Sequence, residues 1–565
     1  MTSSPPEGPY ELLEPRVKNK TGDIPNTPTM NMDSQQEAKP EEAVEECKDG
    51  EAGDETQYLS SAAVALLMVA ISLAMFLVSL DRTIVATAVP KITDHFNSFG
   101  DIGWYASAYA LTGCAMQLPL GRFYSFYTPK WVFLSLVVLF EIGSAICAGA
   151  FNSNTIIIGR AIQGIGCAGV FSGSMILLVD NVPLQKRPLF MGMLMAIMSV
   201  SAIVGPLIGG ALTSNASWRW CFIINIPIGT VTILILLLIV KPTPGKEASK
   251  KSPLEHLKML DPLGAALLIP AVICLVLALQ WGGSEYAWKS WQIVLLLVFG
   301  GLLGIAFMVS QKLNPEIATI SPRIVKQRTV AAGFYYSTCT GGAMMTVVYW
   351  IPIWFQAIKN ASPVKSGEMT IPLLISQSLG SISGGILVSQ VVGYASPFMI
   401  LSSVMMAVGA GLLSTLSISS AAGKWIGYQV LFGFGLGIGQ QQPSTAVQVV
   451  LKKDDIPSAI SLIFFGMQLG GSVCVCIGQN VLNQELIKSL TKARIPGLDP
   501  MAVLHTGATE LENLVHSALE KTPLLLAYNH SLTSVFYVAS AVGALSIIGS
   551  VLVEWKSVKG MKPAH

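Results

Sequence analysis

This chain of 565 residues contains a long series of apolar segments, and almost none of them carries a charged residue. Its composition is 52% hydrophobic and 12% charged, whereas soluble domains are about 25% charged. A helix needs about 20 apolar residues to cross the hydrocarbon layer of a bilayer. The segments therefore predict an all-α integral membrane protein with fourteen transmembrane helices.

The predicted spans form groups of six, two and six, and basic loops separate the groups. Repeated bundles around a site at the bilayer midplane are typical of secondary transporters. The spans are expected near residues 62–88, 103–123, 131–150, 155–179, 190–212, 220–240, 263–280, 291–310, 330–350, 370–392, 398–418, 425–449, 458–480 and 531–553.

The same segmentation predicts the domain organisation. Residues 1–59 hold fourteen acidic and five basic residues and no segment long enough to span or to build a core, which is typical of a disordered tail. The predicted parts are an acidic cytosolic tail (1–59), a six-helix bundle (60–240), a cytosolic loop (241–262), an inserted two-helix hairpin (263–310), a second cytosolic loop (311–329), a C-terminal six-helix bundle (330–555) with an outer loop (481–530), and a cytosolic tail (556–565).

Lysine and arginine gather in the loops that an even number of spans places on one side, for example at 186–187, 250–251 and 452–453. The positive-inside rule then predicts that both termini are cytosolic. We therefore expect a multi-pass membrane protein. The nine cysteines show no metal-binding spacing, so no metal is predicted.

Charged residues inside a span are the first candidates for function, because each costs about 3 kcal/mol or more at the membrane centre. Asp81 and Glu141 are the carboxylates within the predicted spans, and Arg160 lies in the fourth span. Burial favours the neutral form of a carboxyl group and so favours proton exchange near neutral pH. No histidine lies in a predicted span, so proton coupling is expected at these three residues.

Structural roles are the alternatives for these charges. Glu141 could hydrogen-bond a neighbouring helix, Asp81 could be a polar helix-end residue, and Arg160 could extend to the interface. Gln163 lies three positions after Arg160, on the same helix face, which indicates a face turned toward protein.

Glycine and proline mark the fifth span, which contains Gly192, Gly205, Pro206, Gly209 and Gly210. Small residues allow two helix backbones to approach closely, and proline permits a bend. Ordinary close packing of helices is the alternative to a transport role.

Several motifs in chain order resemble those of one family, the fourteen-span drug:H⁺ antiporter-2 group of the major facilitator superfamily, and in particular fungal toxin and multidrug efflux pumps. The fifth span resembles the glycine-rich antiporter motif that ends GPxxGG, and Arg160-Ala-Ile-Gln163-Gly164 matches RxxQG. The other matching stretches are Leu80-Asp81-Arg82-Thr83-Ile84-Val85, the WRWxFxINxPxG signature from Trp218 to Gly229, and the YxxPxxFQ pattern from Tyr349 to Gln356.

One motif departs from the family pattern. The loop after the second span resembles GxLaDrxGrk, but Ser125 replaces the aspartate and Pro129 replaces a basic residue. The gating ion pair that the resemblance implies would therefore lack its carboxylate here.

The resemblance implies a proton-coupled exporter of small amphipathic molecules that works by alternating access, as a monomer, with no cofactor beyond the proton gradient and no nucleic-acid partner. It also implies the plasma membrane, with a vacuolar or vesicle membrane as the alternative. No nucleophile–base constellation or phosphate-binding loop suggests an enzyme. Aromatic and amide side chains suit an apolar cargo with a few polar groups. The predicted cavity residues are Gln163, Tyr349, Trp350, Gln356 and Gln440.

Two other functions remain open at this stage. One is a vacuolar amino-acid or siderophore transporter of the same fold, and the other is a membrane sensor that does not transport. Asn215, Asn360 and Asn529 begin N-x-Ser sequons in predicted outer loops and are candidates for glycosylation.

Overall fold

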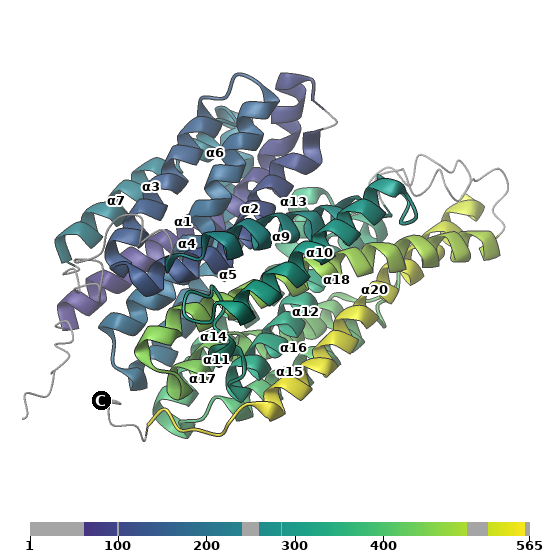
Figure 1. The fold of residues 1–565 in the computed structure, drawn as a ribbon. Coiled ribbons are helices and arrows are strands. Elements are labelled where there is room, and N and C mark those ends of the chain that lie inside the picture. Colours follow the sequence, from purple (N-terminus) through teal and green to yellow (C-terminus); the bar gives the residue numbers. More distant parts are fainter. Residues whose placement is uncertain (1–60, 99–100, 240–258, 284, 494–517, 560–565) are drawn as a thin grey trace, which may run out of the picture. The chain divides into compact units, whose positions relative to one another are not determined.

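The computed structural model describes residues 61–98, 101–239, 259–283, 285–493 and 518–559. Helices account for nearly all of the regular structure in these ranges (Figure 1), and the β-structure within them is an isolated bridge between Gly282 and Tyr286. The all-α prediction is confirmed. The predicted tail at 1–59 and most of the loop at 241–262 lie outside the described residues.

Each of the first six predicted spans coincides with helical structure. The helices of this half are α1 (Ser61–Phe96), α2 (Ile102–Phe126), α3 (Pro129–Ala148), α4 (Ser153–Asn181), the short η2 (Leu184–Lys186), α5 (Arg187–Asn215), α6 (Trp220–Ile223) and α7 (Asn225–Ile239). Local sequence sets several starts. Asn152 caps α4 by accepting a hydrogen bond from the Thr155 amide at 2.8 Å, and Pro129 occupies the first turn of α3.

The remaining eight predicted spans also coincide with helices. The predicted hairpin is α9 (Pro262–Trp281) and α10 (Trp291–Leu313). The C-terminal half contains α11 (Pro322–Val325), α12 (Arg328–Lys359), α13 (Pro363–Met369), α14 (Ile371–Ile386), η3 (Leu387–Val392), α15 (Ser396–Leu413), α16 (Ala422–Gln440), α17 (Gln442–Val450), η4 (Lys453–Asp455), α18 (Ile456–Ala493) and α20 (Ala518–Leu552).

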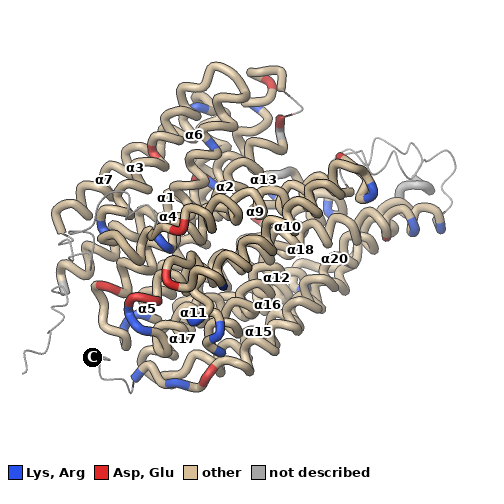
Figure 2. The backbone as a smooth tube through the Cα atoms, in the orientation of Figure 1, with Lys and Arg blue, Asp and Glu red and all other residues tan. Residues whose placement is uncertain are grey.

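Twelve helices in the described ranges are long and apolar enough to cross a membrane, so the predicted count of fourteen is not confirmed. The two others that match predicted spans are α2 and α16, which are less apolar. Arg122 and Gln117 lie in α2, and α16 is rich in glycine. Figure 2 shows most charged positions at helix ends, as expected for a chain that crosses lipid.

The predicted outer loop at 481–530 is shorter than expected. α18 continues to Ala493 and α20 begins at Ala518, so both ends of this stretch are helical, while 494–517 lies outside the described residues. These helix ends are amphipathic: Leu482 and Leu486 of α18 and Leu524 of α20 are buried in one cluster, while Glu485 and Lys488 are charged and Lys488 is exposed, so the apolar signal there is diluted. His530 consequently lies inside the candidate span Thr522–Leu552, although no histidine was expected in a span.

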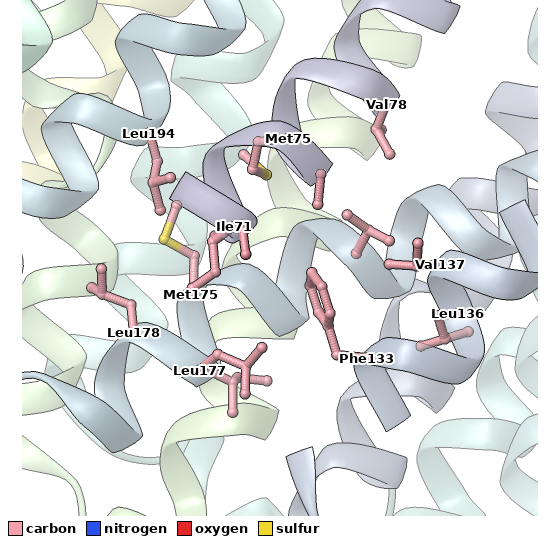
Figure 3. Close-up of a cluster of buried hydrophobic side chains, with 14 of the residues drawn as sticks. Ile71, Met75, Val78, Phe133, Leu136, Val137, Met175, Leu177, Leu178 and Leu194 are labelled. Atoms are coloured by element: carbon pink, nitrogen blue, oxygen red, sulfur yellow. The ribbon is translucent and has the colours of Figure 1, made fainter. Parts of the chain in front are cut away.

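The N-terminal half is packed around α1. Ile71, Met75 and Val78 of α1 lie in one buried cluster with Phe133 of α3 and Leu178 of α4 (Figure 3). In the C-terminal half, α12 has the corresponding place, because it packs along both α18 and α20. The first long helix of each half therefore packs along several of the helices that follow it.

The two halves meet mainly along two helix pairs, α5 with α14 and α2 with α18. Polar contacts cross between them where α2 ends and α5 begins. Nη1 of Arg187 lies 3.4 Å from Oε1 of Gln448, and the Ser125 and Ser458 hydroxyls are 3.2 Å apart. Ser125, which replaces the family aspartate, thus makes a neutral hydrogen bond across the halves instead of an ion pair.

The hairpin is closed at its base by Asp261, which caps α9 in a left-handed conformation with φ of 51°. Its carboxylate accepts hydrogen bonds from the Gly264 amide at 2.8 Å, from Gln311 Nε2 of α10 at 2.6 Å and from the Thr319 hydroxyl at 2.8 Å. One buried carboxylate therefore joins the start of α9, the end of α10 and the segment that leads to α12.

Candidate functional site

The interior of the N-terminal half holds an ion pair between α1 and α4. Nη1 of Arg160 lies 2.5 Å from Oδ2 of Asp81. The Asp81 side chain is fully buried, and Arg160 is 1% exposed. Both residues were predicted from the sequence as separate candidates, and the fold places them in contact.

Neutral polar side chains complete the coordination of the Asp81 carboxylate. Oδ1 accepts hydrogen bonds from Gln163 Nε2 and from Asn225 Nδ2, each at 3.0 Å. The same two amide groups also donate to the Ser144 hydroxyl, at 2.8 Å and 3.2 Å. Side chains from α4 and the start of α7 therefore converge on the Asp81 carboxylate of α1, and Ser144 of α3 accepts hydrogen bonds from both of their amide groups.

Arg160 is held from the other side by α2. Its Nε donates to the Tyr105 carbonyl at 3.0 Å, and its guanidinium lies 4.3 Å from the centre of the Tyr109 ring. Nη1 also donates to Gln163 Oε1 at 2.9 Å. A buried charge is tolerated when an opposite charge and further hydrogen bonds surround it, and both conditions are met here.

Small residues bring these helices close enough for the contacts to form. A Cβ on Gly164 would meet the carbonyl of Tyr109 and the hydroxyl of Thr112 on α2. The RxxQG pattern therefore combines two polar residues with a glycine that lets α4 approach α2, and the network depends on all three.

Glu141 of α3 is not part of this hydrogen-bonded network. Both of its carboxylate oxygens are buried without a hydrogen-bond partner among the described residues. The carboxylate lies against Gly229 of α7, where an added Cβ would meet Oε1. An unpaired buried carboxylate is expensive as an anion, so this position suits a group that is protonated part of the time.

The antiporter-motif glycines of α5 face two different helices. A Cβ on Gly205 would meet Thr83, and one on Gly209 would meet Thr87 and Ile84, all on α1. A Cβ on Gly192 would instead meet the Ser381 carbonyl of α14. Pro206 lines a small gap between α5 and α13, and Gly210 has open space beside it. α5 therefore joins the helix that carries Asp81 to the opposite half.

The predicted cavity residues are not gathered at one place. Gln163 belongs to the Asp81 network, and Trp350 is buried among core side chains of the C-terminal half. Gln356 donates to the Ser366 hydroxyl at 3.0 Å, and Gln440 accepts from Gln377 at 2.9 Å. Tyr349 is 51% exposed. Their role in binding cargo stays a prediction.

The sequons differ in their surroundings. Asn215 is the last residue of α5 and is exposed, and Asn360 ends α12 in a left-handed conformation and is exposed. Asn529 was expected in a loop, and this is wrong, because it lies within α20 and is buried. Its amide oxygen accepts from Trp354 Nε1 at 2.9 Å and its nitrogen donates to the Leu416 carbonyl at 3.1 Å.

Ser144, Asn225, Tyr105 and Tyr109 were not predicted as site residues. Asn225 stands inside the WRWxFxINxPxG signature, so a polar residue at a span start was a usable signal. Tyr105 contributes a backbone carbonyl, which no sequence pattern indicates. No group of three or more potential metal ligands converges within the part of the chain that the structure describes, and the absence of a cofactor stays a prediction.

Comparisons with known proteins agree with this architecture. A family model described as Major Facilitator Superfamily matches residues 71–474. The chain is 55% identical over 512 residues to the efflux pump ustT of Ustilaginoidea virens, a match that covers 91% of this chain and 88% of that protein. It is 48% identical over 511 residues to the MFS-type transporter VdtG of Byssochlamys spectabilis, a match that covers 90% of this chain and 91% of that protein.

Solved structures show the same fold at low sequence identity. The structure of the proton:xylose symporter XylE is similar with a TM-score of 0.56 at 14% identity, covering 86% of this chain and 95% of that one. At this identity the likeness concerns the fold alone.

Proposed function

Because this chain belongs to the Major Facilitator Superfamily and is a membrane transporter rather than an enzyme, we propose that it exports small amphipathic organic molecules in exchange for protons. Relatives named as efflux pumps, 55% identical in the case of ustT, support the direction of transport. The buried Asp81–Arg160 pair, with its ring of neutral partners, is the observation that carries the proton-coupling part of the proposal.

In the proposed mechanism, protonation of Asp81 neutralises the carboxylate that Arg160 and two amide groups share. The Arg160 charge is then left with neutral partners, and the contacts that join α1, α4 and α7 weaken. Neutralising one partner of a buried charge pair is strongly destabilising, because the other charge stays buried without compensation. Proton arrival would therefore change the relative stability of two arrangements of the N-terminal half, as a bistable switch requires.

The carboxylate of Glu141 provides a second proton acceptor in this proposal. It is buried and unpaired among the described residues, and it faces α7, the helix whose first residue is Asn225. Protonation of Glu141 lowers the cost of its burial, because a neutral carboxyl group is much cheaper to bury than a carboxylate. Movement of α7 after protonation of Asp81 would change the environment of Glu141.

The antiporter-motif glycines would carry this change to the other half. Gly205 and Gly209 contact α1, and Gly192 contacts α14. Alternating access requires the halves to rock against each other around a fixed site. Close backbone packing along α5 transmits a displacement of α1 without needing flexible side chains.

The proposal includes fourteen membrane helices. α2 and α16 are 25 and 19 residues long, and helices of these lengths extend roughly 37 Å and 28 Å, close to or beyond the thickness of the hydrocarbon layer. Their polar and glycine residues suit helices that pack along neighbours on several sides, and α16 packs against both α14 and α15. Both termini are then cytosolic, and the plasma membrane is the proposed location.

The proton gradient supplies enough energy for this work. One proton that moves inward through about 100 mV releases about 2.3 kcal/mol, and each pH unit adds about 1.4 kcal/mol. With two pH units the total is about 5 kcal/mol, which supports a concentration ratio above roughly a thousandfold for an uncharged cargo.

The test is export from proteoliposomes by the full chain, with and without an imposed pH gradient, against a panel of apolar aromatic toxins and, separately, amino acids and iron-loaded siderophores. We expect gradient-dependent movement of the aromatic compounds only. Asp81→Asn abolishes the gradient dependence, Glu141→Gln reduces it, and Asp94→Asn, an exposed carboxylate on the same helix, retains it.

Other outcomes identify the rival functions. Movement of amino acids or siderophores alone would replace the proposed cargo. A chain that moves none of these compounds but loses a cellular signal on deletion of residues 1–55 would be a sensor. Gradient-dependent export that survives both carboxylate substitutions would place proton coupling elsewhere.

A further inference from the structure

A cavity of about 440 Å³ lies between the inserted hairpin and both halves of the protein. Its walls come from the start of α2, the end of α9, the later part of α12 and the middle of α18. It therefore lies at the opposite helix ends from the polar contacts of Arg187 and Ser125. The volume is within the usual range of about 300–1,000 Å³ for small-molecule sites.

The turn of the hairpin is fixed against α18 and not simply adjacent to it. Trp288 Nε1 donates to Asn480 Oδ1 at 2.8 Å, and Asn483 Nδ2 lies 3.4 Å from the Gly283 carbonyl. Within the turn, the Gly283 amide donates to the Tyr286 carbonyl at 2.8 Å, and Gly283 has a φ of 78°, which favours glycine. These contacts hold the cavity wall formed by α9 in place.

Aromatic rings line the cavity from separate helices. Trp104 of α2 and Trp281 of α9 make an edge-to-face contact with centroids 6.0 Å apart. Trp281 also makes an edge-to-face contact with Tyr286 of the hairpin turn, with centroids 6.0 Å apart. Tyr349 of α12 is 51% exposed and lines the same space. Large aromatic side chains exposed to a cavity offer flat apolar faces to a ligand at little cost in conformational entropy.

The side chains that line the cavity carry negative charge and no positive charge. Glu285 is the charged residue among the side chains that line the cavity, and it is exposed. The other polar groups, Ser107, Gln280 and Gln479, are neutral. Aromatic faces attract a cation through their ring quadrupole, and a carboxylate adds to that attraction, so the cavity favours a single positive charge over a negative one.

We propose that this cavity is a binding site for planar aromatic molecules that carry one positive charge, built by the inserted hairpin together with α2, α12 and α18. This inference rests on the proposed export function and names a class of cargo for it. Trp104, Trp281 and Tyr349 supply the aromatic contacts, and Glu285 supplies the preference for a cation.

The test is direct binding to the full-length protein in lipid nanodiscs, read by fluorescence polarisation with empty nanodiscs as the blank. The probes are rhodamine 6G, an aromatic cation, and fluorescein, an anion with the same xanthene ring system. We expect rhodamine 6G to bind with a Kd at least about tenfold lower than that of fluorescein. Equal affinity for the two dyes would overturn the proposal.

Substitutions in the wall separate the ring contacts from the charge. Trp281→Leu is expected to raise the Kd of rhodamine 6G about tenfold. Glu285→Gln is expected to raise this Kd about threefold and to reduce the difference in Kd between rhodamine 6G and fluorescein. The matched controls are Trp291→Leu, an exposed tryptophan on α10 outside the cavity, and Asp94→Asn on α1. Native affinity in both wall variants would overturn the proposal.

A variant that fills the cavity keeps the test decisive if Trp281→Leu fails to fold. Ala106 is exposed and lines the space, so Ala106→Trp is expected to abolish rhodamine 6G binding without burying a new side chain in the core. Ala110→Trp, one helical turn away on α2 and outside the lining, is the control and retains it. Unchanged binding in Ala106→Trp would place the dye elsewhere.

Failure of the proposed export function and failure of the cavity proposal give different results. If the pH gradient drives no export but Ala106→Trp still abolishes binding, the cavity is a cation site in a protein with another activity. If the gradient drives export and every cavity variant binds rhodamine 6G as the native protein does, the cavity proposal is overturned and the export function stands.

Discussion

Asp81 and Arg160 lie 79 positions apart in the chain and form a buried ion pair at 2.5 Å between α1 and α4. Two amide side chains on the Asp81 carboxylate and one backbone carbonyl on Arg160 complete the site. The pair and its partners thereby connect α1, α2, α4 and α7 of the N-terminal half, and one carboxylate that can take up a proton lies at their centre.

Replacement of Asp81 by asparagine is expected to remove proton coupling and to destabilise the protein. Arg160 would keep its charge in a buried site without a counter-ion, which costs about 3–5 kcal/mol. Thermal unfolding in detergent should show a lower Tm for Asp81→Asn, with Asp94→Asn unchanged. A native Tm for Asp81→Asn would mean that the pair contributes little to stability.

The double variant Asp81→Asn/Arg160→Gln should be more stable than either single variant. Neutralising both partners leaves no unpaired charge, so the two changes are not additive, and coupling between contacting residues reaches about 0.5–3 kcal/mol. Denaturant unfolding of the four proteins measures this coupling. Additive losses of stability in the double variant would contradict the contact between Asp81 and Arg160. Export should stay absent in the double variant, because the carboxylate that takes up the proton is missing.

The glycines of α5 provide a test with a control inside the same motif. Gly205→Ala and Gly209→Ala each add a Cβ against α1, and overpacking of this kind costs about 1–3 kcal/mol. Gly210→Ala meets nothing within 4 Å and should be neutral or slightly stabilising. Equal effects of all three substitutions on Tm and export would show that close packing of α5 on α1 is unimportant.

Asn529 is expected to carry no glycan, because its amide is buried and hydrogen-bonded in α20. Asn529→Ala should lower the free energy of unfolding by about 1–3 kcal/mol through the unpaired Trp354 and Leu416 groups. The change in gel mobility on endoglycosidase treatment should be the same for the native chain and for Ser531→Ala, which removes the sequon and keeps the asparagine. A larger shift for the native chain than for Ser531→Ala would contradict this structure around α20.

The base of the hairpin predicts a pH dependence of stability. Burial raises the pKa of Asp261, but hydrogen bonds from Gln311, Thr319 and Gly264 outweigh it and hold the pKa below its usual value. A lowered folded-state pKa adds stability that is fully present above the unfolded value, near 4, and is lost as the pH falls through the folded value. Asp261→Asn should therefore be less stable than the native protein at pH 7, and the difference should shrink below about pH 4. A pH-independent difference in Tm would contradict this assignment.

Hydropathy alone predicted much of the fold. Each predicted span coincides with a helix, because lipid requires every backbone group to be paired within its own segment, which makes long apolar segments helical wherever they occur. The same argument was wrong at the end of α18 and the start of α20, where the helices continue as amphipathic segments that pack Leu486 and Leu524 into one buried cluster. Charged residues between the apolar positions dilute the signal of such extensions when the sequence is read without the helix boundaries.

The sequence by itself determined which residues are the candidates for proton coupling, because charge is so costly in a membrane that Asp81, Glu141 and Arg160 stand out in an apolar background. Only the tertiary structure decided that Arg160 pairs with Asp81, that Glu141 stays outside the network, and that Ser144, Asn225 and the Tyr105 carbonyl complete it. The physical reason is that burial cost depends on residue type, whereas pairing depends on how far each helix is rotated and how closely glycines let its neighbours approach.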